Sequence, residues 1–549
     1  MSGFLQVFCV LFSSFITSLA IPNEVLLLGS PVLGLVALAP LYGALYHARS
    51  YRQAALLTGL QIGITHLLSS FWLAFFRDFA VFTLGASCAG TAVIGMAAGC
   101  YLYQPFSRRR PVPGSAEPRL SLPCRTVYFA LVWTAYEWAK STGFLAYPWG
   151  TLSITAVTWN TIRQVAAITG ERGVSFLFAL CAAVIAEGLI QGVFRPGRAG
   201  SWRVPGRLGD WARAVCFCAL LFALALAYGT YELHRDVPPE KTVRSVLVQQ
   251  NLDTWIIGEE ESIAVSRALT EGAASECLEK TGFPPDIGVW SEGILSYTFP
   301  EGADRYDLPL EGAEESLTGF IRRMNFPLLI GGPATLDKEK RHYGNAAILF
   351  DAQGRFVKTY SKVHLVPFAE VIPFADNPVV QALMKAVAGF SYAWTPGNEL
   401  VTFTIPIAGS GSGETVTFSA PICFEDAFGI LCREFFRMGS ELLLNLTNDS
   451  WSLTRSAEYQ HFAIAVYRAI ELRTTLARAT NSGCTVVVDP WGRVLADLPL
   501  FEEAGLYTDI PVYPRRVTPF AAWGDWFCYL AMILALCFWL AGLRSPAHG

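Results

Sequence analysis

Long apolar stretches constrain the fold of this chain more than any other feature of its sequence. About 18–25 mostly apolar residues are enough for a helix to cross a bilayer. The chain is 52% hydrophobic and only 16% charged, whereas soluble proteins are about one quarter charged. We therefore predict about eight membrane-spanning helices. They cover about Phe4–Ile21, Val25–Tyr46, Ala54–Phe76, Val81–Tyr103, Val127–Trp138, Gly173–Val193, Ala214–Tyr231 and Phe520–Leu543. The first has no basic leader, so we expect it to remain in the protein rather than be removed as a signal peptide.

The basic residues of the connecting loops predict the orientation of these helices. With the N-terminus in the cytoplasm, the loops on that side carry twelve arginines, namely Arg49, Arg52, Arg108, Arg109, Arg110, Arg119, Arg125, Arg195, Arg198, Arg203, Arg207 and Arg213. The loops on the other side carry only Arg77, Lys140, Arg163 and Arg172. Because cytoplasmic loops are enriched in Lys and Arg, this bias places residues 235–515 on the outer side of the membrane.

The outer segment has a different pattern, in which short β-rich stretches alternate with helical ones. Strands are predicted at 242–251, 286–290, 327–332, 345–351, 416–424, 442–449 and 484–490, and helices at 312–324 and 457–479. This alternation is typical of an α/β sandwich whose helices cover its sheets. We therefore expect a membrane domain with seven helices (1–240), an outer domain (241–515), and an eighth membrane helix with a cytoplasmic tail (516–549).

Charge and cysteine content argue against several classes of function. The net charge of −4 is too small to indicate a nucleic-acid partner. Most of the 13 cysteines lie in long apolar stretches, where a cysteine is usually a small hydrophobic residue. The sequence contains no metal-type CxxC pair, so we expect neither a metal site nor a disulfide framework.

Three chemically active side chains follow predicted strands of the outer domain. Glu292 follows the strand at 286–290, Lys362 follows a further β-rich stretch, and Cys423 lies at the end of the strand at 416–424. Loops after strands are where α/β proteins bind ligands. The sequence therefore predicts a site that contains a carboxylate, an ammonium group and a thiol.

These three groups can carry out nucleophilic catalysis together. A free thiol has a pKa of about 8.5 and a glutamate one of about 4.3, so direct proton transfer costs about 5–6 kcal/mol. An apolar pocket would raise the pKa of the glutamate, and the ammonium would lower that of the thiol. Each residue alone has an ordinary structural explanation. A Cys–His pair with His364 or His461 is also open, although neither histidine has an evident third group to orient it.

Several sequence blocks resemble those of the nitrilase superfamily. They are WSEG, SKVHLVPFAEVIPF, PICFEDAF, LLLNLTNDSW and RATNSGCTVVVDPWGRV. That superfamily has an αββα sandwich and a Glu–Lys–Cys triad that acts on carbon–nitrogen and acyl bonds. Such a domain between seven spans and a last one resembles the apolipoprotein N-acyltransferases. The stretches GFLAYPWG (143–150) and GERGVSFL (170–177) point to the same branch.

The resemblance assigns a role to each candidate residue. It implies Glu292 as general base, Lys362 as the stabiliser of the oxyanion and Cys423 as the nucleophile. Glu370 and Glu425 match carboxylates that support the site by orienting Lys362 and the incoming amine. Residues expected near the substrate are Trp255, Phe424 and Trp451, with Phe424 at a position where the family often has tyrosine.

The resemblance also implies a reaction and its partners. An acyl chain would pass from a phospholipid to Cys423 as a thioester, and then to the α-amine of an S-diacylglyceryl cysteine at the N-terminus of a lipoprotein. The enzyme would span the bacterial inner membrane several times with its catalytic domain in the periplasm, and it would need no cofactor and no metal. The apolar segment 379–394 is then either a lid that dips toward the lipid or an ordinary buried helix.

Two other functions remain to be weighed. A membrane-tethered amidase or nitrilase would need the same triad but no bundle of seven helices. A transporter with a binding domain would be expected to carry paired charges or broken helices at mid-membrane. Ionisable residues inside spans are costly and often functional, which draws attention to Glu137, Glu187 and Asp525.

Overall fold

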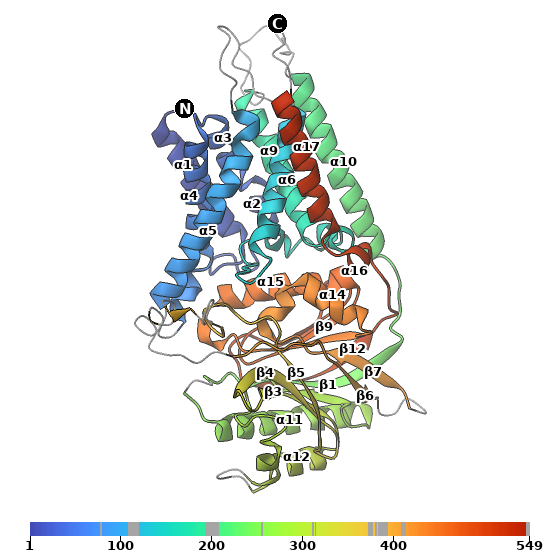
Figure 1. Ribbon diagram of the computed structural model, residues 1–549. Helices are drawn as coiled ribbons and strands as arrows, with labels where there is room; N and C mark the ends of the chain where they lie inside the picture. Colours follow the sequence, from blue (N-terminus) through green and yellow to red (C-terminus); the bar gives the residue numbers. More distant parts are fainter. Residues whose placement is uncertain are drawn as a thin grey trace, which may run out of the picture. The chain divides into compact units, whose positions relative to one another are not determined.

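The chain forms two compact units in the computed structural model (Figure 1). The described residues are 1–76, 80–107, 120–192, 208–253, 256–309, 312, 314–371, 377–378, 382, 394–407 and 413–544. The helical unit contains Met1–Ala74, Ala80–Arg235 and Trp523–Gly549. The sandwich unit contains Phe75–Phe79 and Asp236–Ala522.

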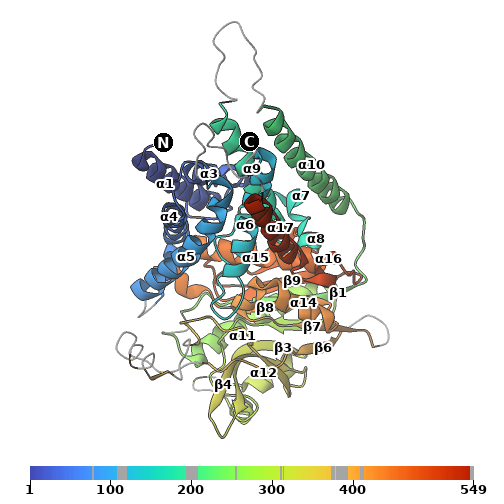
Figure 2. The same cartoon turned by 45° about the horizontal axis from the view of Figure 1, so that its top comes forward.

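Several helices of the helical unit are candidates for membrane spans. The unit contains α1 (Gly3–Ala20), α2 (Pro31–Val36), α3 (Ala39–Tyr46), α4 (Tyr51–Ser69), α5 (Ala80–Tyr103), α6 (Leu122–Lys140), α7 (Asn160–Arg163), α8 (Ala166–Thr169), α9 (Arg172–Ile190), α10 (Leu208–Leu233) and α17 (Trp526–Arg544). Among the described residues, five stretches are long and apolar enough to cross a bilayer: Gly3–Ala20, Thr83–Phe106, Arg172–Ile190, Gly209–Leu233 and Trp526–Leu543. Helix α17, from the far end of the sequence, packs against α6 (Figure 2). The chain is therefore a membrane protein with several apolar helices.

The prediction of one continuous helix over Val25–Tyr46 is wrong. The side chain of Asn23 accepts hydrogen bonds from the backbone N–H groups of Val25 and Leu26, which fold this part into a turn. Helix α2 begins only at Pro31, and α3 follows after a break at residues 37–38. Proline is favoured in the first turn of a helix and disfavoured further along it. The prolines near the starts of α2 and α3 therefore mark two helices rather than one.

The three carboxylates noted inside the spans join helices to one another or to loops. Glu187 on α9 accepts a hydrogen bond of 2.7 Å from Arg125 Nη2 on α6. Glu137 accepts the backbone N–H of Leu152 at 2.8 Å. Asp525 accepts an indole N–H from α6 at 2.8 Å. Since buried charges are stable only when they are paired or hydrogen-bonded, these contacts support a structural role for all three.

The sandwich unit is built on two six-stranded sheets. The first has the order β12-β1-β2-β3-β4-β5 and the second β11-β10-β9-β8-β7-β6. The strands are β1 (Lys241–Gln249), β2 (Ile287–Val289), β3 (Leu328–Asp337), β4 (His342–Phe350), β5 (Phe356–Ser361), β6 (Thr402–Pro406), β7 (Thr415–Ser419), β8 (Leu442–Thr447), β9 (Thr475–Thr480), β10 (Val486–Val488), β11 (Val494–Asp497) and β12 (Ala504–Val512). The central pairs β1–β2, β2–β3, β7–β8 and β8–β9 are parallel.

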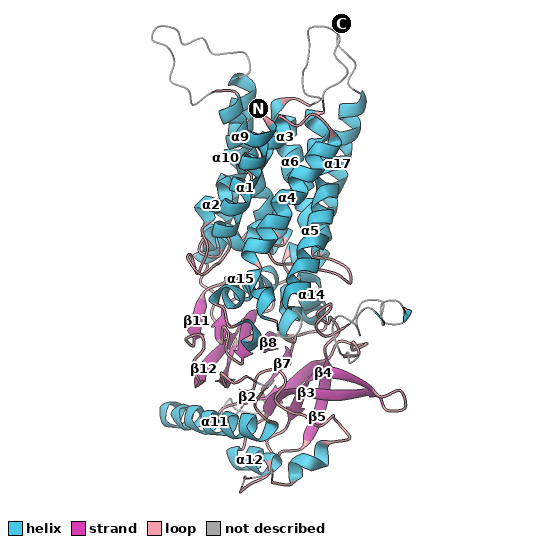
Figure 3. Cartoon of the chain, turned by 90° about the vertical axis from the view of Figure 1, so that its left-hand side faces the viewer, coloured by secondary structure: helices cyan, strands magenta, loops and turns pink. Residues whose placement is uncertain are grey.

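Helices cover the outer faces of both sheets, which gives four layers (Figure 3). Helices α11 (Glu259–Thr281) and α12 (Leu317–Met324) pack on the first sheet, and α14 (Gly429–Arg437) and α15 (Arg455–Leu472) pack on the second. Side chains alternate along a strand, so Leu328 and Ile330 of β3 pack under the helices while Leu329 packs between the sheets. The observed architecture is thus the predicted αββα sandwich.

Several predicted boundaries in this unit are wrong, and two of them change the type of element. The strand expected over 416–424 ends at Ser419, and a short 3-10 helix, η5 (Cys423–Ala427), begins at the cysteine. The helix expected over 457–479 ends at Leu472, where Arg473 takes a left-handed conformation with a φ of 51°. The chain continues as β9, which is buried along its whole length. Tertiary packing thus overrides the helical propensity of residues 475–479.

Candidate active site

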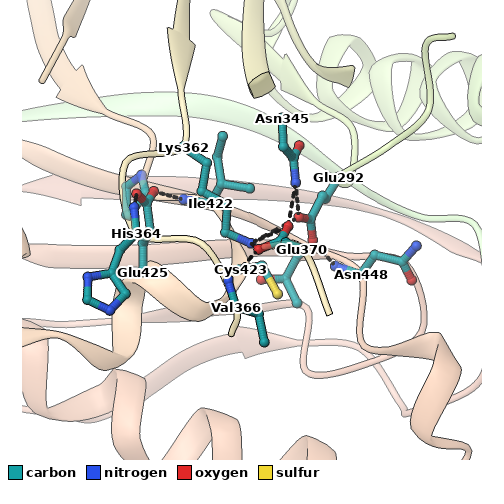
Figure 4. Close-up of polar contacts among 12 residues, drawn as sticks. Glu292, Asn345, Lys362, His364, Val366, Glu370, Ile422, Cys423, Glu425 and Asn448 are labelled. Carbon is teal, nitrogen blue, oxygen red and sulfur yellow. Dashed lines mark hydrogen bonds and ion pairs between the residues drawn. The ribbon is translucent and has the colours of Figure 1, made fainter. Parts of the chain in front are cut away.

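The ends of three strands bring Glu292, Lys362 and Cys423 to one place (Figure 4). Glu292 lies three residues beyond β2, Lys362 directly follows β5, and Cys423 opens η5 after β7. The loop of Glu292 lies tightly against β3, because a Cβ added at Gly331 would lie only 2.5 Å from the Cα of Glu292. Glycine is therefore required at that position of β3.

Lys362 is buried between two carboxylates. Its ammonium nitrogen lies 2.9 Å from each carboxylate oxygen of Glu370. It also lies 3.4 Å from Oε1 of Glu292. The Lys362 side chain is 0% exposed, and those of Glu292 and Glu370 are 10% and 14% exposed. Both carboxylates therefore act on this cation with little screening by water.

Asn345 on β4 connects the same two carboxylates. Its amide nitrogen donates to Glu292 Oε1 at 2.6 Å and to Glu370 Oε1 at 3.1 Å. The other oxygen of Glu292 accepts the backbone N–H of Asn448 at 3.0 Å. Asn448 belongs to the resembling block LLLNLTNDSW and Asn345 lies in a predicted strand, but neither sequence position gave an indication of these contacts. They leave the Glu292 carboxylate fixed at both oxygens.

Burial and charge shift the pKa values of these groups in known directions. Burial disfavours the charge of Lys362, but Glu370, Glu292 and Cys423 outweigh it and hold the pKa of the ammonium well above its ordinary value. Burial raises the pKa of Glu292, and the charge of Glu370 raises it further, against the lowering effect of Lys362. Lys362 is therefore a cation at any physiological pH, and Glu292 is a stronger base than an exposed glutamate.

Cys423 has a strained backbone and a half-buried thiol. Its φ of 49° is left-handed, which is uncommon for a non-glycine residue and is typical of functional positions. Figure 4 draws Cys423 beside Glu292, Lys362 and Glu370, and the charges of all three act on its thiol. Burial and the charge of Glu292 raise the pKa of the thiol well above its usual range, although Lys362 lowers it. The ammonium thus lowers the pKa of the thiol as expected, but burial and Glu292 outweigh this effect.

Glu425 supports the backbone on two sides of the site. Oε1 accepts the hydroxyl of Tyr360 at 2.8 Å and the backbone N–H groups of Val363 and His364 at 2.8 and 3.0 Å. Oε2 accepts the N–H of Ile422 at 2.8 Å. These bonds join the loop after Lys362 to the residue before Cys423. The expected support of Lys362 by Glu425 therefore acts through the backbone, whereas that by Glu370 is direct.

The residues expected near the substrate have different surroundings. Phe424 is buried, and its ring lies 5.7 Å from that of His364 and 4.8 Å from that of Phe428. Trp451 is half-buried, and its ring packs edge-on against that of Phe76. Trp255 lies outside the described residues, as does the proposed lid 379–394 apart from Ala382 and Trp394. The N–H of Trp394 donates to the carbonyl of Glu370, so the C-terminal end of this segment lies beside Glu370.

The histidines do not pair with the thiol. His461 is oriented by two carboxylates, contrary to the expectation from sequence, because Asp449 and Asp426 lie 2.8 and 2.9 Å from its ring nitrogens. Both nitrogens are thus engaged, and neither is left to accept a proton from Cys423. The ring of His364 stacks on Phe428 at 3.9 Å. In the described part of the chain, no group of three or more His, Cys, Asp or Glu could hold a metal ion.

Comparisons with known proteins cover nearly the whole chain. Residues 286–517 match the carbon-nitrogen hydrolase family, and residues 13–184 match the apolipoprotein N-acyltransferase N-terminal domain. Apolipoprotein N-acyltransferase 2 of Treponema denticola is 41% identical over 538 residues, which are 98% of this chain and 97% of that protein. The protein of the same name in Treponema pallidum is 39% identical over 98% of this chain and 94% of its own length.

Two further comparisons are more distant. Apolipoprotein N-acyltransferase of Borreliella burgdorferi is 30% identical over 96% of this chain and 94% of its own. A solved amidase of the nitrilase superfamily from Nesterenkonia is 21% identical, with a TM-score of 0.34 over 50% of this chain and 93% of its own.

Proposed function

Because this chain belongs to the apolipoprotein N-acyltransferase family, we propose that it transfers an acyl chain from a phospholipid, through a thioester on Cys423, to the N-terminal amine of a diacylated lipoprotein. The protein is an acyltransferase by its family. The observation that supports this route most directly is the grouping of a strained cysteine, a buried cation and a base of raised pKa at one set of strand ends.

In the first half-reaction, Cys423 attacks the carbonyl carbon of the acyl ester. Glu292 takes the proton of the thiol as the carbon–sulfur bond forms, and Lys362 provides the positive charge that stabilises the oxyanion. The carbon–oxygen bond then breaks, and the proton held by Glu292 passes to the departing glycerol oxygen. The products are a lysophospholipid and a thioester on Cys423.

In the second half-reaction, the acceptor amine attacks the thioester carbonyl. Glu292 takes a proton from the amine nitrogen as the carbon–nitrogen bond forms. The carbon–sulfur bond breaks, and the proton returns to the sulfur of Cys423. One amide is formed and the enzyme is regenerated, so a single glutamate acts as base and acid twice in each cycle.

The lipid substrates suggest where the reaction takes place. Moving an acyl chain into water costs about 0.8 kcal/mol per CH₂ group, which favours a site fed directly from the bilayer. We therefore assign residues 1–240 and 516–549 to the membrane and residues 241–515 to a catalytic domain on the periplasmic side of a bacterial inner membrane. The excess of arginine in the loops assigned to the cytoplasm supports this orientation.

The direct test is capture of the acyl-enzyme. The full-length protein in detergent is incubated with a phospholipid that carries a labelled acyl chain and is then treated with neutral hydroxylamine, which cleaves thioesters. We expect label on the wild type that hydroxylamine removes, and no such label on Cys423→Ser. Cys277→Ser is the matched control, since Cys277 is a buried thiol on α11, the helix that covers the outer face of the first sheet.

Either of two results would contradict this proposal. Absence of label from folded, lipid-bound wild type would exclude the phospholipid as acyl donor and favour hydrolysis of a soluble amide. Hydroxylamine-sensitive label on Cys423→Ser at the wild-type level would place the thioester on another residue.

A further inference from the structure

Five ionisable side chains form a buried cluster beside the nucleophile, on the helix-covered side of the second sheet. They are Asp426 on η5, Asp449 after β8, Glu458 and His461 on α15, and Arg478 on β9. None of these residues is more than 7% exposed. Burial of so many ionisable groups is costly unless their charges balance and their hydrogen bonds are made. The cluster plays no part in the reaction described above.

The geometry around His461 identifies its protonation state. Nδ1 lies 2.8 Å from Asp449 Oδ2, and Nε2 lies 2.9 Å from Asp426 Oδ1. A neutral imidazole has one donor and one acceptor nitrogen, whereas an imidazolium donates from both. A neutral ring would set a lone pair against one of the two carboxylates. Only the imidazolium therefore satisfies both contacts.

The charges of the cluster balance only if His461 is protonated. Nε of Arg478 lies 3.1 Å from Asp426, and Nη2 lies 3.8 Å from Asp449. Burial and the charge of Asp449 hold the pKa of Glu458 well above its usual value, which disfavours a third negative charge in the cluster. Two aspartates then face two cations. In agreement, Asp449 and Asp426 overcome the effect of burial and raise the pKa of His461 to about 9.

The cluster is connected to both the nucleophile and the base. Asp426 is three residues after Cys423 in the same short helix. Asp449 directly follows Asn448, whose backbone N–H donates to Glu292 at 3.0 Å. Asn445 adds a second link, because its amide donates to the carbonyl of Cys423 at 3.3 Å. The imidazolium thus joins the segment that carries the thiol to the segment that holds the base.

We propose that His461 is a positioning residue that is protonated at neutral pH, and that its imidazolium clamps η5 to the loop after β8 and so holds Cys423 in place beside Glu292. This proposal rests on the proposed function of these two residues. A displacement of about 1 Å between reacting groups can cost about 100-fold in rate. Loss of the clamp should therefore lower the reactivity of Cys423 without changing the binding of substrates that do not touch His461.

The pH dependence follows from the groups that face the ring. These are Asp426 from η5, Asp449 from the β8 loop, Arg478 from β9 and Glu458 from its own helix. Both aspartates favour the imidazolium and Arg478 opposes it. As pH rises above the pKa of His461, one of the two clamping hydrogen bonds is lost, and the reactivity of Cys423 in the wild type should approach that in His461→Gln at the same pH.

The first measurement is the protonation state itself. The full-length protein contains seven histidines, and labelling them with ¹⁵N lets the signals of His461 be assigned by their loss in His461→Gln. We expect both ring nitrogens of His461 to give protonated-type signals at pH 7.5. Signals of a neutral tautomer at that pH would overturn the proposal, whatever the acyl donor is.

The second measurement is the rate at which iodoacetamide alkylates Cys423, followed on the peptide that contains it. This rate needs no lipid substrate, so it separates the clamp from the proposed reaction. We expect His461→Gln to slow alkylation about 10- to 100-fold. In the double variant His461→Gln/Asp426→Asn, alkylation should be at least tenfold faster than in His461→Gln, because a hydrogen-bonded pair of neutral amides can replace the ionic pair.

A matched control separates positioning from stability. Arg244→Gln removes a part-buried ion pair of 2.8 Å between Arg244 on β1 and Asp286 just before β2, and it should leave the alkylation rate within twofold of wild type. The positioning role would be excluded if Cys423 in His461→Gln were alkylated at the wild-type rate. It would also be excluded if its alkylation rate fell no further than that of the control when the two variants unfold at the same temperature.

Discussion

Replacing Lys362 by methionine tests the electrostatic design of the site. The side chain stays unbranched, becomes one atom shorter and loses its charge. At the observed distance of 3.4 Å from Glu292, the attraction is about 5 kcal/mol with an effective dielectric constant of about 20. This corresponds to at most about 3–4 units in the pKa of Glu292, at about 1.4 kcal/mol for each unit.

The sign of the effect follows from the residues around the ammonium. Without the cation, the pKa of Glu292 rises further, and the carboxyl is protonated at neutral pH. The pKa of Cys423 rises too, because Lys362 is the group that lowers it. A change of only about 2 units would reduce the reactive fraction about 100-fold. We expect Lys362→Met to slow alkylation of Cys423 at pH 7 by about 100-fold or more.

A companion variant distinguishes the two roles of Lys362. The single variant leaves two carboxylates without their cation, and breaking a buried pair in this way typically costs about 3–5 kcal/mol. Lys362→Met/Glu370→Gln removes one charge of each sign and restores the net charge of the site. Its folding and the alkylation of Cys423 should therefore recover. Acyl transfer should stay low, because no ammonium remains to stabilise the oxyanion.

The assays are alkylation of the Cys423 peptide, acylation of a synthetic diacylated lipopeptide, and thermal unfolding in detergent. Lys362→Arg keeps the positive charge and should remain within about tenfold of wild type in alkylation. Wild-type alkylation at pH 7 by a folded Lys362→Met protein would refute the electrostatic reasoning. Wild-type acyl transfer by the double variant would remove the oxyanion role from Lys362.

Three further predictions concern neighbouring residues. Glu292→Gln is isosteric and removes the base, so acyl transfer should fall about 10²–10⁴-fold while the unfolding temperature stays near that of wild type; a loss below tenfold would point to another base. Asn345→Asp places a third carboxylate where the amide now donates to Glu292 at 2.6 Å, so its kcat should be lower than that of Asn345→Ala; the opposite order would contradict the hydrogen-bond assignment. The pKa of His461 is raised from 6.5 to about 9, so its contribution to stability is complete below about pH 6.5 and lost as pH rises through about 9, about 3 kcal/mol in all. Unfolding temperatures of wild type and His461→Gln between pH 6 and 10 measure this contribution, and equal slopes in the two proteins would disprove it.

The elements of the site were predictable where the sequence carries a local signal. A hydrophobic β-rich stretch that ends in a charged residue placed Glu292 and Lys362 at strand ends, as the structure has them. The contacts of Asn345 and Asn448 were not predictable, because Asn345 reaches Glu292 from another strand of the first sheet and Asn448 reaches it from the second sheet. The partners of His461 come from segments 12 and 35 residues away, and no periodicity in the sequence relates them.

The number of charges explains how a thiol of raised pKa can serve as the nucleophile. With both carboxylates ionised, Glu292, Glu370 and Lys362 carry a net charge of −1. Ionisation of Cys423 alone would make this −2 in a buried site, which is why burial and Glu292 raise the pKa of the thiol. Transfer of the thiol proton to Glu292 leaves the net charge unchanged.

The quantity that matters for attack is therefore the difference between the two pKa values rather than either value alone. Burial raises the pKa of both groups, but Lys362 lies between the carboxylates and stabilises either anionic partner. A preformed thiolate is not needed, because the proton can move as the carbon–sulfur bond forms. On this reasoning the site depends on close positioning of Glu292 and Cys423, which is the role that we assign to the buried cluster around His461.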